Sequence, residues 1–96
     1  MKLEIYSLIG CPYSMKSESL LRLYKPNIHK ISQEEKEKYK QQNNMETFPQ
    51  IFLLDENGKT KIGGYSDVKY LLSKVFKNEK INLNNSETIT NFFLNK

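Results

Sequence analysis

Short stretches of β-branched, aromatic and other apolar side chains, bounded by glycine, proline or polar turns, punctuate the chain. Such stretches are typical of strands, because branched and aromatic side chains pack well on a pleated sheet. They predict four strands, at residues 2–9, 27–32, 49–55 and 59–62. The sequence DENG at 55–58 is a hairpin turn signal, so the last two strands are expected to pair antiparallel.

Between the strands, apolar residues recur at the spacing of a helix. After Pro12, the apolar residues Leu20, Leu23 and Tyr24 predict a helix that Pro26 ends. Pro12 suits the first turn of that helix, where its missing N–H costs nothing. The charged segment 33–44 fits either a surface helix or a polar loop.

The clearest helical stripe lies in residues 66–76, with Ser66 or Asp67 as the expected N-cap. The stripe consists of Val68, Leu71, Leu72, Val75 and Phe76. Residues 86–96 place apolar side chains on one face and predict a terminal helix that closes over the core. These side chains are Ile89, Phe92 and Phe93.

The predicted elements follow the order βαβ(α)ββα(α). A helix joins the first two strands, so these strands are expected to be parallel, and the sheet is mixed. At 96 residues the chain is expected to form a single α/β domain, 1–96, in which 78–96 is a tail with a terminal helix.

Composition narrows the class of protein. Hydrophobic residues make up 38% and charged residues 27%, as in an ordinary soluble domain. We expect no membrane span, no secretory leader and a reducing, cytoplasmic setting, because the chain has no long apolar run and a single cysteine. The net charge of +4 comes from lysine, and Arg22 is the one arginine, so we expect no nucleic-acid partner.

Cys11 follows a predicted strand and precedes a predicted helix. A lone cysteine is most often a buried, inert hydrophobe. At a helix N-terminus, however, unsatisfied N–H groups favour the thiolate, which is the nucleophile. The sequence therefore leaves two readings of Cys11 open, an inert core residue and a reactive thiol.

Two further segments have the character of binding sites. Pro49 begins a strand, and it fits either an ordinary strand start or a cis peptide bond at Phe48–Pro49. In GGYSD at 63–67, the glycines and the helix start present backbone N–H groups to a carboxylate, and Asp67 can meet an ammonium group. The simpler interpretation of GGYSD is a turn followed by an N-cap. His29 lies away from these motifs and is expected at the surface.

Together, three motifs resemble those of the glutaredoxin family over about residues 1–77: GCPYS at 10–14, TFPQIF at 47–52 and IGGYSD at 62–67. They are similar to the family's CPYC active site, its cis-proline segment and its glutathione pocket. The resemblance implies a thioredoxin-like fold, in which helices flank a four-stranded mixed sheet. It also implies a glutathione-dependent thiol–disulfide oxidoreductase that acts as a monomer, with glutathione as co-substrate and glutathionylated or disulfide-containing proteins as partners.

The resemblance also assigns roles to individual residues. Cys11 matches the nucleophile and Tyr13 the aromatic residue that flanks the glutathione sulfur. The backbone of Phe48 is expected to pair with the cysteine unit of glutathione, and Ser66 and Asp67 to hold its γ-glutamyl group. The full set of expected site residues is Cys11, Tyr13, Lys36, Thr47, Phe48, Pro49, Ser66 and Asp67.

Three positions depart from the family pattern around glutathione. Leu8 stands where the family usually has a lysine or arginine that supports the thiolate, and Glu46 stands where a basic residue is common. The position that often supplies a glutamine to the glycine carboxylate falls on Lys36. We expect Lys36, or Lys40 one turn later, to take over that contact.

Ser14 is the fourth departure, because it replaces the second cysteine of a dithiol motif. Serine cannot resolve a mixed disulfide, so the second thiol has to come from solution. The first hypothesis is therefore a monothiol enzyme that reduces glutathione mixed disulfides. The alternatives are a homodimer that carries a [2Fe–2S] cluster on two Cys11 thiolates and two glutathiones, and a weakly active binding module. Cys11 in that cluster would be the one metal ligand of the chain.

Overall fold

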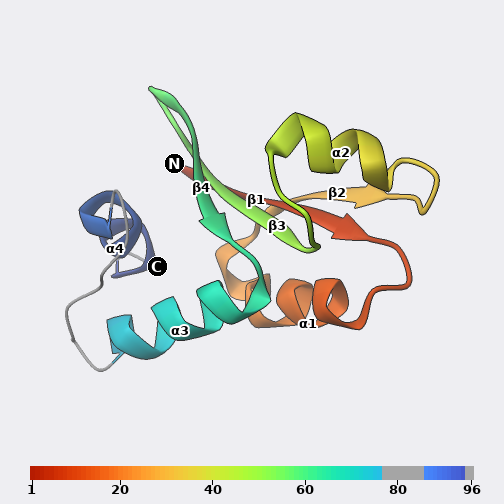
Figure 1. The fold of residues 1–96 in the computed structure, drawn as a ribbon. Helices are drawn as coiled ribbons and strands as arrows, with labels where there is room; N and C mark the ends of the chain where they lie inside the picture. The colour runs from red at the N-terminus through yellow and green to blue at the C-terminus, as the bar shows by residue number, and fades with distance from the viewer. Residues whose placement is uncertain (77–85, 95–96) are drawn as a thin grey trace.

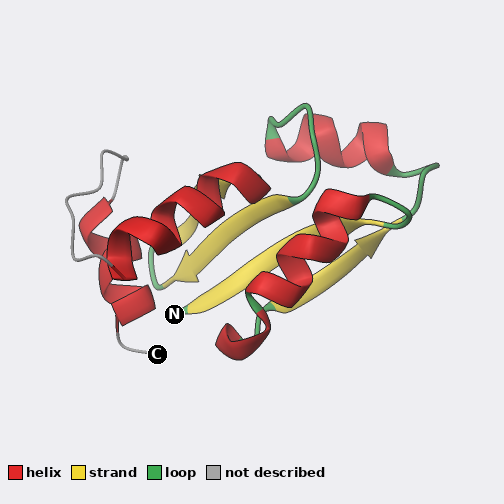
Figure 2. Ribbon diagram, turned by 90° about the horizontal axis from the view of Figure 1, so that it is seen from below, coloured by secondary structure: helices red, strands yellow, loops and turns green. Residues whose placement is uncertain are grey.

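A computed structural model describes residues 1–76 and 86–94 of the chain, drawn as a ribbon in Figure 1. A four-stranded sheet lies between helices on its two sides (Figures 1 and 2). The elements, in chain order, are β1 (Lys2–Leu8), α1 (Pro12–Leu20), the 3-10 helix η1 (Arg22–Tyr24), β2 (Asn27–Ile31), α2 (Lys36–Asn43), β3 (Gln50–Asp55), β4 (Gly58–Gly63), α3 (Tyr65–Phe76) and α4 (Ser86–Leu94).

The strands lie in the order β2-β1-β3-β4. β1 and β2 are parallel, as expected for strands joined by a crossover helix. β3 pairs antiparallel with β1 and forms an antiparallel hairpin with β4. The predicted α/β class, the mixed sheet and the thioredoxin-like arrangement are confirmed. Segment 33–44, which the sequence left open, contains α2.

One face of the sheet carries an apolar core under α1 and α3 (Figure 2). Alternate residues of the central strands point into it, because successive side chains of a strand point to opposite faces. The helices add four residues of the predicted α3 stripe, from Val68 to Val75, and the aromatic face of α4. The buried members include Leu3, Ile5, Ile51, Leu53, Val68, Leu71, Leu72, Val75, Ile89, Phe92 and Phe93.

The apolar face of α1 differs from the prediction. Leu20 and Leu23 are 37% and 84% exposed, so they do not form the buried stripe. The buried positions are instead Ser14, Ser17 and Leu21, all fully shielded from solvent. Small hydroxyl side chains let this helix approach the sheet closely. Because serine is not apolar, the spacing of apolar residues did not predict this buried face.

The other face of the sheet lies against α2 and is partly polar. Its apolar cluster consists of Tyr6, Ile31, Phe48 and Phe52, with Leu8, Tyr39 and Met45 packed against it. Glu4 lies on the same face of β1 as Tyr6, and it is only 7% exposed. A buried carboxylate needs compensating partners, and for Glu4 these are His29 and Lys59.

The helix starts have local causes. Before α2, Ser32 and Glu35 exchange hydrogen bonds, with the Glu35 N–H donating to Ser32 Oγ and the Ser32 N–H donating to Glu35 Oε1, both at 3.3 Å. This is the geometry of a capping box. α3 begins at Tyr65, so Ser66 and Asp67 lie within its first turn and the predicted N-cap is wrong.

The terminal helix α4 packs its aromatic face on the core, as predicted. Tyr24 contacts both phenylalanines, with ring centroids 6.1 Å from Phe92 and 4.9 Å from Phe93. The rest of the predicted tail, 78–85 and 95–96, lies outside the described residues. Among the helices that the structure describes, none is long and apolar enough to cross a membrane.

Candidate active site

Cys11 is the N-cap of α1, directly before Pro12 at the first helical position. Its N–H donates to the Leu8 carbonyl at 3.1 Å, which closes the turn after β1. Gly10 in that turn has a φ of 86°, which a glycine adopts without strain. The turn leaves Cys11 partly exposed, so the predicted strand-to-helix junction is confirmed and Cys11 is not a buried core residue. Its role as a reactive thiol stays a prediction.

Ser14 points in the opposite direction, into the protein. It is fully buried, and its Oγ accepts a hydrogen bond from the Leu8 N–H at 3.0 Å. The hydroxyl therefore joins the start of α1 to the end of β1. Serine thus has a structural role at position 14.

The Phe48–Pro49 peptide bond is cis, so the interpretation of Pro49 as an ordinary strand start is wrong. The Phe48 ring is 9% exposed and belongs to the cluster under α2. Its carbonyl oxygen lies 3.8 Å from Cys11 Sγ, within the range of a weak S–H···O hydrogen bond. Phe48 thus offers its backbone, and not its ring, to the neighbourhood of the thiol.

The GGYSD segment forms the wall of the site opposite the cis-proline loop. Gly63 has a φ of 133°, and a Cβ there would overlap the Asp67 carboxylate. Asp67 Oδ2 accepts a hydrogen bond from the Gly64 N–H at 2.8 Å. A carboxylate accepts up to about four hydrogen bonds, so Asp67 retains acceptor capacity for a ligand.

These segments enclose a pocket of about 270 Å³. Six of the expected site residues line it, together with three that the sequence analysis did not assign. The lining residues are Tyr13, Met45, Thr47, Phe48, Pro49, Gly64, Tyr65, Ser66 and Asp67. Gly64 and Tyr65 belong to the GGYSD motif and were within reach of motif reading, whereas nothing in the sequence singled out Met45.

The residues expected to supply a positive charge to the glycine carboxylate of glutathione do not line the pocket. Lys36 is the first residue of α2 and is not among the residues that line the pocket. Lys40 forms an ion pair with Glu37 at 3.2 Å. Leu8 packs against the cluster under α2, so its side chain serves the core. The assignment of Lys36 to a glycine carboxylate therefore stays a prediction.

Polar contacts hold the loop between α2 and β3, which carries the cis-proline segment. The Asn43 side chain donates to Gln50 Oε1 at 2.8 Å, and both residues are buried. Gln50 Nε2 donates to the Met45 carbonyl at 3.4 Å, and Lys61 Nζ donates to the Asn44 carbonyl at 2.7 Å. These contacts fix both ends of the loop, and the sequence analysis did not foresee them.

The same polar contacts extend to Glu4. Its carboxylate lies 2.9 Å from His29 Nε2 and 3.4 Å from Lys59 Nζ, and Lys59 also donates to the Tyr6 hydroxyl at 2.8 Å. Burial alone would raise the pKa of Glu4, but hydrogen bonds with His29 and Tyr6 and the Lys59 charge together lower it. Burial by itself would lower the pKa of Lys59, and its bonds to Tyr6 and Glu4 raise it. His29 is 44% exposed, as expected, yet it is also paired.

In the part of the chain that the structure describes, no group of three or more His, Cys, Asp or Glu side chains is placed to hold a metal ion. The arrangement around Cys11 brings a partly exposed sulfur next to the Phe48 carbonyl, at the edge of the pocket. A thiol in such a position is suited to thiol–disulfide exchange.

Solved structures of known proteins resemble this fold. A dithiolic glutaredoxin from Trypanosoma brucei brucei is 31% identical, with a TM-score of 0.56, over 76% of this chain and 78% of that one. A glutaredoxin from Brucella melitensis is 26% identical, with a TM-score of 0.55, over 77% and 80% of the two chains. Glutaredoxin 1 from Francisella tularensis, at 21% identity and a TM-score of 0.58 over 79% and 96%, shares the fold.

No family model matches the sequence, and neither does any curated protein. The fold and the site nevertheless define a thiol–disulfide oxidoreductase of the thioredoxin-like class. Within that class, the chain belongs to the glutaredoxin family. It differs from the dithiolic relative in having a single cysteine.

Proposed function

We propose that this protein reduces mixed disulfides between glutathione and protein thiols, using Cys11 alone. The observation that carries the proposal is the position of Cys11 Sγ, 3.8 Å from the Phe48 carbonyl of the cis-proline segment that lines the pocket. An extended cysteine unit paired with that backbone brings its sulfur next to the nucleophile. The reaction then occurs on the glutathione sulfur and not on the substrate sulfur.

The pocket residues fit the chemical groups of glutathione. The Asp67 carboxylate suits the γ-glutamyl ammonium, and backbone N–H groups in the first turn of α3, at Ser66, suit its carboxylate. Tyr13 and Thr47 flank the cysteine unit. We assign the glycine carboxylate to Lys36, at the start of α2.

The reaction has two balanced steps. The Cys11 thiolate attacks the glutathione sulfur of the mixed disulfide, so the Cys11–glutathione bond forms and the substrate sulfur leaves as a thiol after taking a proton from water. A second glutathione thiolate attacks the bound glutathione sulfur and releases glutathione disulfide and the Cys11 thiolate. The net reaction consumes one reduced glutathione: its sulfur is oxidised as it joins the former adduct in glutathione disulfide, and the substrate sulfur is reduced to a thiol.

This cycle requires reduced glutathione, so we also propose a cytoplasmic location and a role in redox homeostasis through deglutathionylation. We propose that the chain acts as a monomer, since each step uses groups of one copy. The hypothesis of a [2Fe–2S] carrier stays a prediction, because its four sulfur ligands would come from two chains and two glutathiones. A brown colour after anaerobic reconstitution would support it.

The decisive experiment measures turnover of a small glutathione mixed disulfide by the natural sequence and its variants at positions 11 and 14. Cys11→Ser should abolish turnover. Ser14→Cys should give no gain, because glutathione already supplies the second thiol. Ser14→Ala is the matched control, since it removes the same hydrogen bond to the Leu8 N–H without adding a thiol. Turnover that survives Cys11→Ser would refute the proposal.

The ligand assignments need separate variants. Asp67→Asn should raise KM for the mixed disulfide, because it removes the negative charge facing the γ-glutamyl ammonium. Lys36→Glu should weaken glutathione binding, whereas Lys38→Glu, two residues along the same helix and outside the pocket, should not. Equal affinities for Lys36→Glu and the natural protein would contradict the role of Lys36 and leave that of Cys11 intact.

A further inference from the structure

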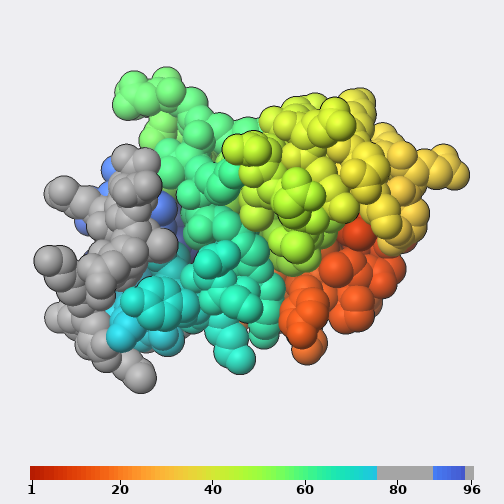
Figure 3. All heavy atoms as spheres, in the orientation of Figure 1, coloured from red at the N-terminus to blue at the C-terminus, as the bar shows by residue number. Residues whose placement is uncertain are grey.

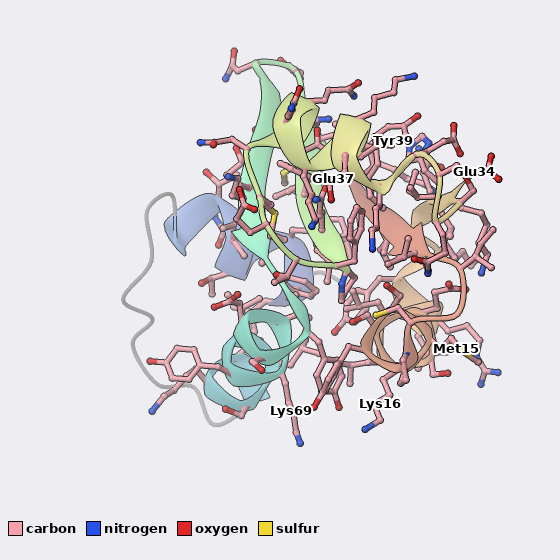
Figure 4. All side chains as sticks on the ribbon, turned by 45° about the vertical axis from the view of Figure 1, so that its right-hand side comes forward. Met15, Lys16, Glu34, Glu37, Tyr39 and Lys69 are labelled. Atoms are coloured by element: carbon pink, nitrogen blue, oxygen red, sulfur yellow. The ribbon has the colours of Figure 1, made fainter. Side chains whose placement is uncertain are left out.

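A row of two tyrosines and two lysines crosses from α1 to α3 beside the active site. Lys16 Nζ lies 5.2 Å from the centre of the Tyr13 ring, and the Tyr13 and Tyr65 ring centres are 5.7 Å apart. Lys69 Nζ lies 5.9 Å from the centre of the Tyr65 ring. Figure 4 shows Lys16 and Lys69 projecting to the same side of the molecule from the two neighbouring helices.

An open groove of about 560 Å³ adjoins this row. Its lining combines exposed apolar side chains with one positive charge, and consists of Met15, Lys16, Ser19, Leu20 and Tyr65. Met15 is 61% exposed and Leu20 is 37% exposed, although both are apolar. Tyr65 lines the groove as well as the pocket beside Cys11, so the two depressions adjoin the same residue.

The charge around the groove has one sign. No carboxylate is among the residues that line it. On α1, the Glu18 carboxylate forms an ion pair with Lys30 at 2.7 Å. On α3, the Asp67 carboxylate accepts a hydrogen bond from the Gly64 N–H. Glu34 and Glu37 lie at or beside α2 in the upper part of Figure 4, away from Lys16 and Lys69 at the bottom. Lys16 and Lys69 therefore present a positive field to a molecule that approaches Cys11 from this side.

We propose that this groove docks the protein part of the substrate, as a segment that carries acidic residues and a bulky apolar side chain next to its glutathionylated cysteine. The inference rests on the proposed function, because it concerns the same thiol. The apolar side chain lies against Met15 and Leu20 while the carboxylates meet Lys16 and Lys69. Glutathione in its pocket and the segment in the groove then approach Cys11 from the two sides of Tyr65.

The test compares two synthetic peptides with one glutathionylated cysteine each, one flanked by Glu and Leu and the other by Lys and Leu. The natural protein should have the higher kcat/KM for the acidic peptide, and the preference should fall as salt rises. The double variant Lys16→Glu, Lys69→Glu should lower kcat/KM for the acidic peptide by about tenfold, given ordinary exposed charge pairs. Met15→Gln should weaken the binding of both peptides alike.

Two controls separate this docking surface from the glutathione chemistry. Lys38→Glu makes the same charge change as either single substitution of the double variant and removes the same kind of contact, since Lys38 Nζ lies 5.3 Å from the Tyr39 ring on α2, and it should spare the preference. A small glutathione mixed disulfide, which does not reach the groove, should be turned over equally by all these variants. If the natural protein does not turn over that small substrate, the proposed function fails. The groove can still be tested by measuring how tightly the acidic peptide binds to Cys11→Ser.

Three results would overturn the inference. One is equal kcat/KM for the two peptides in the natural protein. Another is a loss in Lys38→Glu as large as that in Lys16→Glu or Lys69→Glu alone, because net charge would then be the cause. The last is competition by a short single-stranded oligonucleotide as strong as that by the acidic peptide, because the surface would then select anions and not a protein segment.

Discussion

The two faces of the sheet are covered by different kinds of side chain. The face under α1 and α3 is covered by aliphatic and aromatic side chains from β1, β3, β4, α3 and α4. The face under α2 combines aromatic rings with buried or half-buried polar groups, namely Glu4, Asn43 and Gln50 with their partners His29 and Lys59. Both faces exclude water from the same strands, yet only the second touches the loop that carries the cis-proline segment.

This difference separates two tasks. Apolar contacts are non-directional, so the first face contributes stability without fixing a particular loop geometry. Hydrogen bonds are directional and costly to leave unmade, so the second face holds the ends of the loop in one position. The space-filling view in Figure 3 shows the α2 segment lying directly above the residues of the active-site turn. Breaking either face should therefore produce a different kind of defect.

The largest loss of stability should come from the apolar face. Leu53 is fully buried there, and Leu53→Ala should cost about 2–5 kcal/mol in the free energy of unfolding, measured in urea. The neighbouring Leu54 points to the other face and is only partly buried, so Leu54→Ala should cost less than about 2 kcal/mol. Equal losses would mean that the two faces do not differ as described.

A smaller loss of stability but a specific loss of binding should follow from Gln50→Leu. It leaves the Asn43 amide and the Met45 carbonyl without their partner, at a cost of about 1–3 kcal/mol. Because the loop loses its anchor, KM for the glutathione mixed disulfide should rise. The double variant with Asn43→Leu should restore part of the stability without restoring KM. An unchanged KM in Gln50→Leu would mean that the hydrogen bonds of the polar face do not hold the loop in its binding position.

A pH-dependent effect should come from Glu4→Gln. The pKa of Glu4 lies below its ordinary value of 4.5 in the folded protein, so the unfolded chain binds the proton more readily. The ionised carboxylate thus contributes stability above pH 4.5, and this contribution disappears as the pH falls through the folded pKa. Urea unfolding should show the natural protein more stable than Glu4→Gln at neutral pH, with the difference shrinking in acid. A constant difference would contradict the ionic contribution.

The smallest effect is expected at the rim of the apolar face, where Lys30 pairs with Glu18. The Lys30 side chain is 57% exposed, so Lys30→Gln should cost at most about 1 kcal/mol. Burial raises the pKa of Glu18, but bonds to Lys30 and Ser7 outweigh it and the pKa is lowered. High salt should erase the difference between the natural protein and Lys30→Gln. A loss above about 2 kcal/mol would show that the pair is part of the core.

Periodicity predicted the elements well because it reports which side chains face the interior. It found the strands, α3, the aromatic face of α4 and the junction at Cys11. It misread α1, because Ser14 and Ser17 are small polar residues that are nevertheless fully buried, and a hydrophobic pattern does not register them. It also put the N-cap of α3 too late, since Asp67 bonds back to Gly64 from within the helix.

The motifs located the site, but its geometry depended on distant residues. Lys36, expected at the pocket, lies outside its lining, and Met45 lines it without any sequence signal. The partners of the loop come from α2, β3 and β4, and the polar contacts beside it join residues separated by up to 53 positions, as in the bond from Lys59 to Tyr6. No local pattern encodes such pairs, because each one depends on the register in which two strands meet.

The sequence by itself determined the order and type of the elements, the α/β class and the three motifs around Cys11, because these follow from local periodicity and turn chemistry. The tertiary structure decided which polar groups meet. It buried Ser14 as a link between α1 and β1, turned the Phe48 carbonyl toward Cys11, and placed Tyr13 and Tyr65 side by side between two lysines. These contacts join residues that are distant along the chain, and folding alone brings them within bonding distance.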